Sequence, residues 1–304
     1  MEIKQLRYFL AIVEAGNITR AAQSLHIAQP ALSYHILNLE SDLKTKLLNR
    51  SVKGVTPTST GEILYRHAAA ILRQINDIRV AVDKNSASPS GRVTVGIPGS
   101  TARILVIPLL RKLEKFPDIL LEIVERQSGE IAALVAQGRL DMGITVDTRA
   151  TRGVTIMSLA HEELYAILPT IRIKLDKVMT LECLAGFPLV LPSAPNLTRM
   201  KLDLAFLEAH LSYRLLAEVS TTDLLIRIVQ SGIACTVLPW SAVSDEIQLK
   251  RLYAIPMKKP TLTRELSLCL SESVPLTQAA QLVQKLIVDT VPKLLAKGKW
   301  HKCG

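Results

Sequence analysis

A short segment near the N-terminus combines a polar helix face with basic residues. Pro30 favours the start of a helix, and helical spacing places Leu32 and Ile36 together on its inner side. The residues at its entrance or away from that side are Gln29, Pro30, Ser33, Tyr34 and Asn38. Amide and hydroxyl groups on one helix face can hydrogen-bond to base edges in a DNA major groove. This pattern predicts DNA binding.

Basic residues follow this helix. The stretch 44–53 contains no Asp or Glu, and its basic residues are Lys44, Lys46, Arg50 and Lys53. Residues 50–57 are expected to form a small β wing with Gly54 at its turn. Basic groups on a wing contact phosphates, which position a protein on DNA without reading its sequence. A solvated helix in an unrelated bundle is the alternative, and it would have no use for this basic segment.

Two helices are expected before this segment. The first stops at Gly16, and its apolar side consists of Leu6, Phe9, Leu10 and Val13. Thr19 is expected to cap the N-terminus of the second. The third is expected to run to about Asp42, with Leu43 also facing inward.

A long helix is predicted from about residue 59 to residue 83. Its apolar stripe consists of Ile63, Leu64, Ala68, Ile71, Leu72, Ile75, Ile78 and Val82. A stripe outside a compact domain needs a partner, which is either another part of this chain or a second subunit. Residues 84–91 are rich in Ser with Pro and Gly, which is typical of a flexible hinge.

From Arg92 onward, predicted strands alternate with helices. The expected strands are residues 92–98, 119–125, 140–145, 163–168, 188–191, 217–219, 235–239 and 264–270, followed by a closing helix at 277–295. Such alternation favours a parallel sheet with helices on both faces, which binds ligands outside the carboxyl ends of its strands. Two α/β lobes crossed twice by the chain resemble a periplasmic-binding-protein fold, which closes on a small molecule.

Polar side chains occupy the turns between these strands and helices. Such turns offer free backbone N–H groups and a hydroxyl, which together suit an anion. The candidates are Ser100, Thr101, Ser128, Thr145, Ser193, Asn196, Ser220, Thr221 and Thr222. Each is equally well explained as a simple helix cap. Arg103 and Arg199 could pair with an acidic ligand or lie on the surface.

Composition narrows the class of protein. A chain of 304 residues with 48% hydrophobic content is long enough for more than one domain, and its net charge of +10 permits polyanion binding. No apolar run approaches the roughly 20 residues of a membrane span, so we expect a cytoplasmic protein with no membrane partner. The four cysteines, Cys183, Cys235, Cys269 and Cys303, are far apart in the sequence. This spacing suggests reduced thiols, although a redox switch between two cysteines brought together by the fold stays open. The histidines show no metal-ligand spacing.

The N-terminal motifs resemble one family. Residues 21–40 read A-A-Q-S-L-H-I-A-Q-P-A-L-S-x-x-I-x-x-L-E, and L-L-x-R and G-V-x-P-T-x-x-G follow. This pattern is similar to the N-terminal domain of LysR-type transcriptional regulators. The nitrogen assimilation control branch is the most similar, since it shares H-I-A-Q-P-A-L-S, G-V-T-P-T and I-L-R-Q. The chain departs from the family at Ala28, Lys44 and Leu48, where serine, glycine and phenylalanine are common.

The resemblance implies an α/β protein of three parts. These are a winged helix-turn-helix domain (1–58), a linker helix and hinge (59–90) and a two-lobed effector domain (91–304). Lobe I would comprise about 91–162 and 267–304, and lobe II about 163–266. The linker helix would pair with a second subunit, which gives a homodimer or homotetramer on promoter DNA.

The resemblance also implies an effector that alters promoter binding, and the turn chemistry favours a small anionic metabolite. Ser100, Thr101 and Ser128 match the family's usual effector positions, and Thr145, Ser193 and Thr221 complete our predicted site. Both activation and repression are compatible with these motifs. The alternatives are a cytosolic small-molecule-binding protein and an enzyme with an appended DNA-binding domain. No nucleophile elbow, phosphate-binding glycine loop or cofactor-lysine motif occurs, so we predict no catalytic activity, cofactor or metal.

Overall fold

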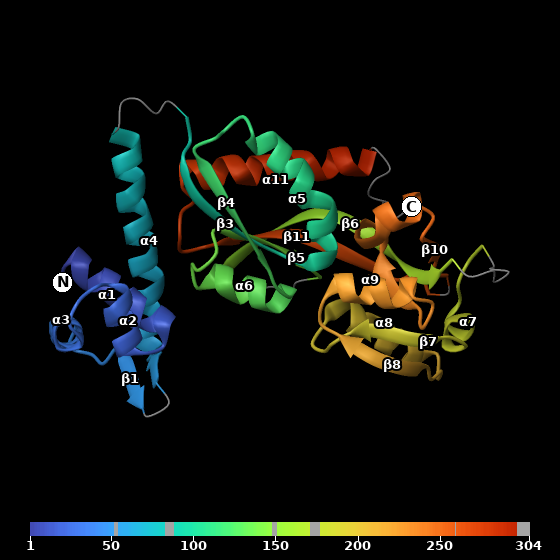
Figure 1. The fold of residues 1–304 in the computed structure, drawn as a ribbon, viewed down its shortest axis with the longest axis horizontal. Helices are drawn as coiled ribbons and strands as arrows, with labels where there is room; N and C mark the ends of the chain where they lie inside the picture. Colours follow the sequence, from blue (N-terminus) through green and yellow to red (C-terminus); the bar gives the residue numbers. More distant parts are fainter. Residues whose placement is uncertain (52–53, 83–87, 148–150, 171–176, 259, 297–304) are drawn as a thin grey trace.

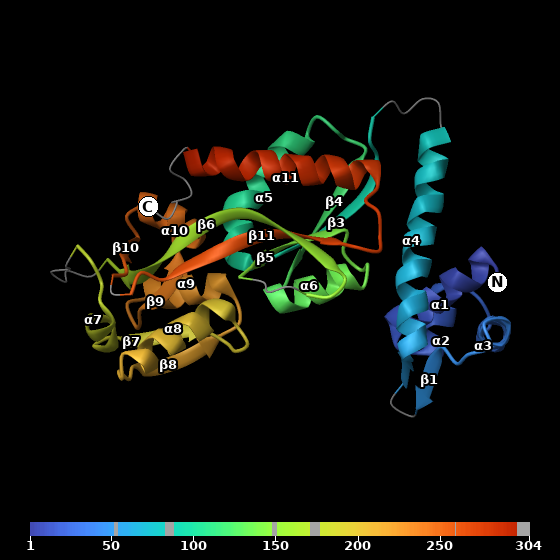
Figure 2. The same cartoon turned by 180° about the vertical axis from the view of Figure 1, so that it is seen from behind.

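The chain forms a small helical unit, a long helix and a larger α/β unit (Figure 1). The computed structural model describes residues 1–51, 54–82, 88–147, 151–170, 177–258 and 260–296. In both views the N-terminal helices lie at one end of the molecule, beside the long helix and away from most of the sheet (Figures 1 and 2).

The N-terminal unit contains three helices and a two-stranded wing. The helices are α1 (Ile3–Ala15), α2 (Ile18–Ser24) and α3 (Gln29–Asp42), and the antiparallel strands are β1 (Leu48–Ser51) and β2 (Gly54–Pro57). Their shared core is fully buried at Phe9, Ile12, Leu32, Ile36 and Leu39. The predicted helix-turn-helix and wing are therefore present, and α1 ends at Gly16, which adopts a φ of 60°.

Two local predictions in this unit are wrong. Asn17, and not Thr19, caps α2, because its Oδ1 accepts hydrogen bonds from the backbone N–H groups of Thr19 and Arg20 at 2.9 and 3.1 Å. Leu43, expected to face inward, is 37% exposed because it lies at the C-terminal cap of α3 rather than within the helix.

The wing is held by contacts on two sides. The Glu40 Oε1 atom of α3 accepts hydrogen bonds from the backbone N–H groups of Leu47 and Leu48 at 2.7 and 3.2 Å. On the other side, the N–H of Val55 donates to the carbonyl of Gly16 at 2.8 Å. A Cβ on Gly54 would lie 2.6 Å from that carbonyl oxygen, so only glycine fits this close approach.

Lys44, where the family commonly has glycine, also has a left-handed backbone conformation. Its φ is 51°, in a region that an L side chain occupies at a cost of roughly 1 kcal/mol. The turn between α3 and the wing therefore explains why glycine suits this position.

Helix α4 (Ser59–Val82) packs partly against the N-terminal unit. Tyr65 and Ala68 are buried, and the Tyr65 hydroxyl donates to the Glu14 carboxylate of α1 at 3.1 Å. Ile63 and Ile71 of the predicted apolar stripe are exposed in the single chain. The stripe is thus only partly covered by intrachain packing.

A mixed sheet runs through the α/β unit. Its order is β10-β6-β11-β5-β3-β4, with β9 also paired to β6. The strands are β3 (Gly91–Ile97), β4 (Ile119–Glu125), β5 (Met142–Val146), β6 (Val154–Pro169), β9 (Thr236–Pro239), β10 (Leu252–Pro256) and β11 (Thr263–Ser271). Within this sheet only β3, β4 and β5 pair in parallel, and β6, β9, β10 and β11 pair antiparallel, so the expected parallel sheet is wrong for that part. The strand expected at 163–168 covers only the second half of the 16-residue β6, and no expected strand corresponds to β10.

Two lobes form around this sheet, and each has its own apolar core. Lobe I combines β3–β5 with α5 (Gly99–Leu113), α6 (Ser128–Ala136) and α11 (Gln278–Ala296). Lobe II contains β9, β10 and the parallel pair β7 (Pro188–Pro192) and β8 (Arg214–Val219), with helices α7 (Leu181–Ala185), α8 (Leu197–Glu208), α9 (Thr222–Gln230) and α10 (Trp240–Gln248). The antiparallel strands β6 and β11 run from one lobe to the other (Figure 2).

Polar contacts connect the lobes on both flanks. Arg103 of α5 donates from Nε to the carbonyl of Ala242 at 2.8 Å and forms ion pairs with Asp223 and Glu246. Lys201 of α8 contacts Asp147, just after β5, at 2.8 Å. Arg103, considered as a partner for an acidic ligand, instead joins the lobes.

We predict that Glu40→Ala lowers the free energy of unfolding of the N-terminal unit by about 2 kcal/mol, because two backbone N–H groups lose a charged acceptor. Glu40→Gln keeps an acceptor oxygen and should lose roughly half as much. Urea denaturation followed by far-UV circular dichroism measures both changes. Equal losses for the two variants would argue against the hydrogen bonds as the cause.

We predict that Arg103→Met lowers the free energy of unfolding of the α/β unit by about 1–3 kcal/mol, since Glu246 and the Ala242 carbonyl lose their donor. Arg92→Met is the matched control, because Arg92 and Glu122 form an exposed ion pair within lobe I. Chemical denaturation should show a clear loss for Arg103→Met and almost none for Arg92→Met. A similar change in both variants would contradict a connecting role for Arg103.

Candidate functional site

The outer side of α3 presents the first candidate surface. Gln29 and Pro30 are exposed at its start, and Tyr34 is 63% exposed one turn later. Ser33 and Asn38 are half-buried. The Gln29 amide donates to the Ser33 hydroxyl at 2.9 Å, which orders the first turn of this face. The structure thus places all five predicted residues of α3 on one accessible helix.

Basic groups lie beside this helix. Arg50 is exposed on β1, and Lys53 lies outside the described residues. Within the described part of the chain, no ion pair joins Lys44, Lys46 or Arg50 to an acid. Their charges are therefore available to phosphate groups. A polar helix with a neighbouring basic wing can bind DNA.

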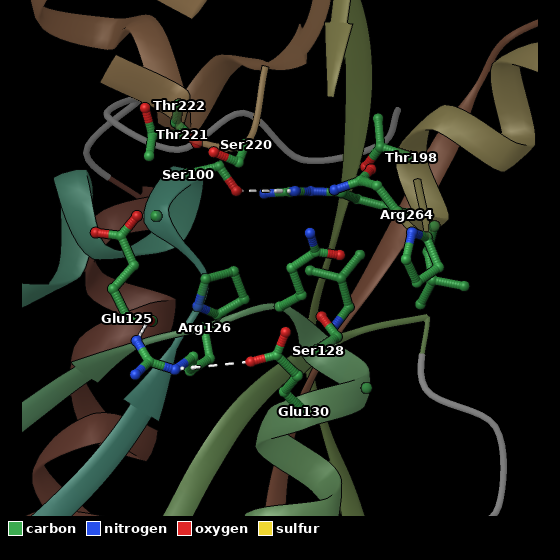
Figure 3. Close-up of a pocket in the computed structure, with 18 residues that line it drawn as sticks. Ser100, Glu125, Arg126, Ser128, Glu130, Thr198, Ser220, Thr221, Thr222 and Arg264 are labelled. Carbon is green, nitrogen blue, oxygen red and sulfur yellow. Dashed lines mark hydrogen bonds and ion pairs between the residues drawn. The ribbon is translucent and has the colours of Figure 1, made fainter. Parts of the chain in front are cut away.

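The second candidate site is a cleft of about 500 Å³ between the lobes (Figure 3). Ser100 and Ser128 line it from lobe I, and Thr221 lines it from lobe II. Asn196, Ser220 and Thr222, also noted at strand ends, contribute to its wall. Half of the six predicted effector residues thus meet in one cleft.

The other three predicted effector residues do not line this cleft. Thr101 is fully buried in the first turn of α5. Thr145 lies within β5, which extends to Val146, and its hydroxyl is 3.5 Å from the sulfur of Cys269. Ser193 follows β7, and its N–H donates to the carbonyl of Val219. Each belongs to the right chain segment, but its side chain is placed elsewhere.

Four helices begin at the cleft. Their N-terminal caps are Pro98 for α5, Gln127 for α6, Asn196 for α8 and Thr221 for α9, and all four residues line it. Only Asn196 accepts a hydrogen bond from the first turn of its helix, whereas the other three side chains cap nothing. Uncapped helix N-termini give a positive potential and free N–H donors.

Arg264 is the charged residue that the sequence pattern missed. It is 4% exposed, and its Nη1 donates to the Ser100 hydroxyl at 3.0 Å (Figure 3). Its Nε donates to Glu162 at 2.7 Å, and the other Glu162 oxygen accepts from Ser241 at 2.7 Å. The only available signal was a basic residue at the start of an apolar strand, which ordinarily indicates an exposed strand end.

Other polar groups hold the lobe I side of the cleft. The Ser128 hydroxyl accepts a hydrogen bond from the N–H of Val146 at 2.9 Å, which fixes the start of α6 against the end of β5. Arg126 forms an ion pair of 3.6 Å with Glu130 one turn further along. Arg199 is not in the cleft, because it pairs with Asp203 and Glu218 in lobe II.

The described cysteines form no disulfide with one another. Cys183, Cys235 and Cys269 are free, and Cys303 lies outside the described residues. Burial raises the pKa of Cys235 to about 11, which keeps it a thiol at neutral pH. The described residues contain no cluster of three potential metal ligands, and none of their helices is long and apolar enough to cross a membrane.

Comparison with known proteins gives a consistent assignment. Residues 3–62 match the family described as "Bacterial regulatory helix-turn-helix protein, lysR family", and residues 86–292 match "LysR substrate binding domain". The chain is 32% identical to the nitrogen assimilation regulatory protein nac of Escherichia coli, with 99% of each chain covered. The corresponding protein of Klebsiella aerogenes is 31% identical, with 96% of each covered.

Solved structures share the fold. A full-length OxyR variant from Pseudomonas aeruginosa superposes with a TM-score of 0.73 at 23% identity, covering 96% of this chain and 94% of that one. ArgP from Mycobacterium tuberculosis superposes with a TM-score of 0.74 at 17% identity, covering 94% of this chain and 96% of that one. The resemblance noted in the N-terminal motifs is confirmed: the chain belongs to the LysR family of DNA-binding transcriptional regulators, with a helix-turn-helix domain and a substrate-binding domain.

Proposed function

We propose that a small anionic metabolite binds in the cleft between the lobes and thereby alters promoter binding by this regulator. One observation carries the proposal: the uncapped N-termini of α6 and α9 converge there with the buried Arg264 guanidinium. Backbone N–H groups and a guanidinium together provide directed donors for a carboxylate or phosphate. Ser100, Ser128 and Thr221 are the predicted effector residues that can take part.

In this proposal, α3 reads the promoter and the wing positions it. Gln29, Ser33, Tyr34 and Asn38 contact base edges, and Pro30 sets the start of the helix. Arg50 and Lys53 contact phosphates. The exposed Gln29 amide and Tyr34 phenol support this division, because both are accessible to a DNA groove.

The proposed assembly is a cytoplasmic homodimer or homotetramer. Ile63 and Ile71 of α4 are exposed in the single chain, and a second copy of α4 would cover them. Two copies also supply two recognition helices for a palindromic site. The proposed domain boundaries follow: 1–58 for DNA binding, 59–90 for the linker helix and hinge, and 91–304 for effector binding, divided between the lobes at about 162 and 267.

We predict that Gln29→Ala and Ser33→Ala each weaken binding to a cognate promoter site by about 1–3 kcal/mol more than binding to random DNA, because base contacts are lost while phosphate contacts remain. Gel-shift titrations on both DNAs measure the difference. Arg50→Ala is the contrasting variant, since loss of a phosphate contact should weaken both complexes alike and reduce the salt dependence of binding. Equal losses on both DNAs for Gln29→Ala would contradict base reading.

We predict that Thr221→Asp abolishes anion binding in the cleft, because its carboxylate would occupy the uncapped N-terminus of α9. The same change should stabilise the unliganded protein by about 0.5–1 kcal/mol through helix capping. Thermal melting with a panel of small carboxylates and inorganic phosphate measures both effects.

Thr180→Asp is the matched control for this experiment, since it changes the cap of α7 and does not line the cleft. A carboxylate-induced shift that survives in Thr221→Asp would place the anion elsewhere. Recovery of the bound ligand unchanged distinguishes a regulator from the alternative class, an enzyme that consumes it.

A further inference from the structure

The charged side chains that line the cleft are balanced in sign. They are two acids and two bases, namely Glu125, Glu130, Arg126 and Arg264. Three of these four charges are already compensated by ion pairs. Glu162 pairs with Arg264 from behind the cleft wall, and Glu130 pairs with Arg126. The negative charge of Glu125 is then the one lining charge that no described side chain compensates.

Glu125 lies where the two lobes approach each other. It is the last residue of β4, and its carboxylate rests against Gly99 at the start of α5. A Cβ on Gly99 would clash with the Glu125 Oε1 atom and would lie 3.2 Å from the Thr222 hydroxyl of lobe II. Within the described residues, no hydrogen bond or ion pair engages this carboxylate. Its charge is therefore open to a ligand.

Arg264 provides an opposite and independent point of attachment. Its guanidinium carries five N–H bonds, of which Nε and Nη1 use one each on Glu162 and Ser100. Nη2 lies 2.5 Å from the same Glu162 oxygen but completes no hydrogen bond within the part of the chain that the structure describes. Nη2 is itself buried on the Glu162 side, so the donor left for an anionic oxygen in the cleft is the second N–H of Nη1, beside Ser100.

The two points are separated by polar groups of the cleft wall. In the view of Figure 3, the Glu125 carboxylate lies on one side of Ser100 and the Arg264 guanidinium on the other. The first turns of α6 and α9 complete the wall with free N–H groups. The cleft therefore offers one region suited to an anion and another suited to a cation.

We propose that the ligand of this cleft is a small zwitterion, which carries a carboxylate and a protonated amine. The carboxylate accepts from Arg264, Ser100 and the N-termini of α6 and α9, and the ammonium pairs with Glu125. This inference rests on the proposed function, which places an effector in the cleft, and it names the chemical class of that effector.

Electrostatics separates this class from its neighbours. A dicarboxylate of similar length would bring its second negative charge towards Glu125, and a simple amine would bring a positive charge towards the helix N-termini. Both arrangements are unfavourable. Because Glu125 is exposed, its contribution is screened by water and salt, and it acts more on the choice of ligand than on overall affinity.

Isothermal titration calorimetry on the full-length protein tests the proposal. The probes are the protein L-amino acids, β-alanine and γ-aminobutyrate, each compared with the carboxylate that lacks its amine and the amine that lacks its carboxylate. At least one amino acid should bind more tightly than both of its counterparts. Glu125→Gln should weaken the binding of that amino acid by roughly threefold to tenfold. The affinity for the amine-free carboxylate should stay unchanged or become tighter.

Glu122→Gln is the matched control, because Glu122 lies on the same strand but does not line the cleft. The zwitterion proposal would be overturned if carboxylates bind as well as their amino acids and Glu125→Gln has no effect. That result would leave the proposed anion site standing. Failure of every probe, zwitterions and carboxylates alike, would overturn both this inference and the proposed effector cleft. Neither result would affect the assignment of the DNA-binding helix.

Discussion

The arrangement of the two lobes depends on one buried ion pair, between Glu162 and Arg264. The two residues lie opposite each other on β6 and β11, the antiparallel strands that pass between the lobes. Glu162 is fully buried and Arg264 nearly so, so their desolvation is offset only because each has further hydrogen bonds. Ser100 lies in the first turn of α5 in lobe I and Ser241 in the first turn of α10 in lobe II, so the same pair fixes both lobes to the shared strands.

This ion pair is also part of the wall of the cleft. The guanidinium that holds β6 and β11 together is the one that lines the space between the lobes. A ligand oxygen that accepts from this guanidinium would compete with Glu162 for the same positive charge and so change the electrostatic balance of the strand crossing. If a ligand binds there as proposed, its binding and the geometry of the lobes are linked through a single side chain.

The helices of the N-terminal unit could be predicted because their signals are local. Contacts between residues far apart in the sequence could not be predicted. Pro30 and the spacing of Leu32 and Ile36 are local, so the limits of α3 follow from the sequence. The role of Glu40 depends on contacts seven and eight residues away, at the start of the wing, which periodicity does not reveal. In the α/β unit, the antiparallel β6 and β11 meet through residues 102 positions apart, as at Glu162 and Arg264.

The same distinction explains the candidate cleft. Helix starts are local features, and Ser100, Ser128 and Thr221 were found from them. Whether a side chain at a helix start faces the cleft or the core depends on how the helix is packed, which placed Thr101 in the core. Arg264 and Glu125 acquire their roles only when strands from distant parts of the chain come together, so residue type and spacing contained no signal for them.

Helix α6 lies between the cleft and the DNA-binding unit. It starts at Ser128 in the cleft and spans nine residues, about 14 Å, and the turn after it carries Arg139. Arg139 lines a cavity of about 310 Å³ together with Glu14 of α1 and Tyr65 of α4. Burial and the neighbouring Glu14 carboxylate raise the pKa of Tyr65 to about 12, so this contact holds a neutral phenol. Because a short helix moves as a rigid body, a displacement of its start at Ser128 also displaces Arg139. The α/β unit is therefore connected to the DNA-binding unit in two ways, through the covalent segment after α4 and through the contact of Arg139 with Glu14 and Tyr65.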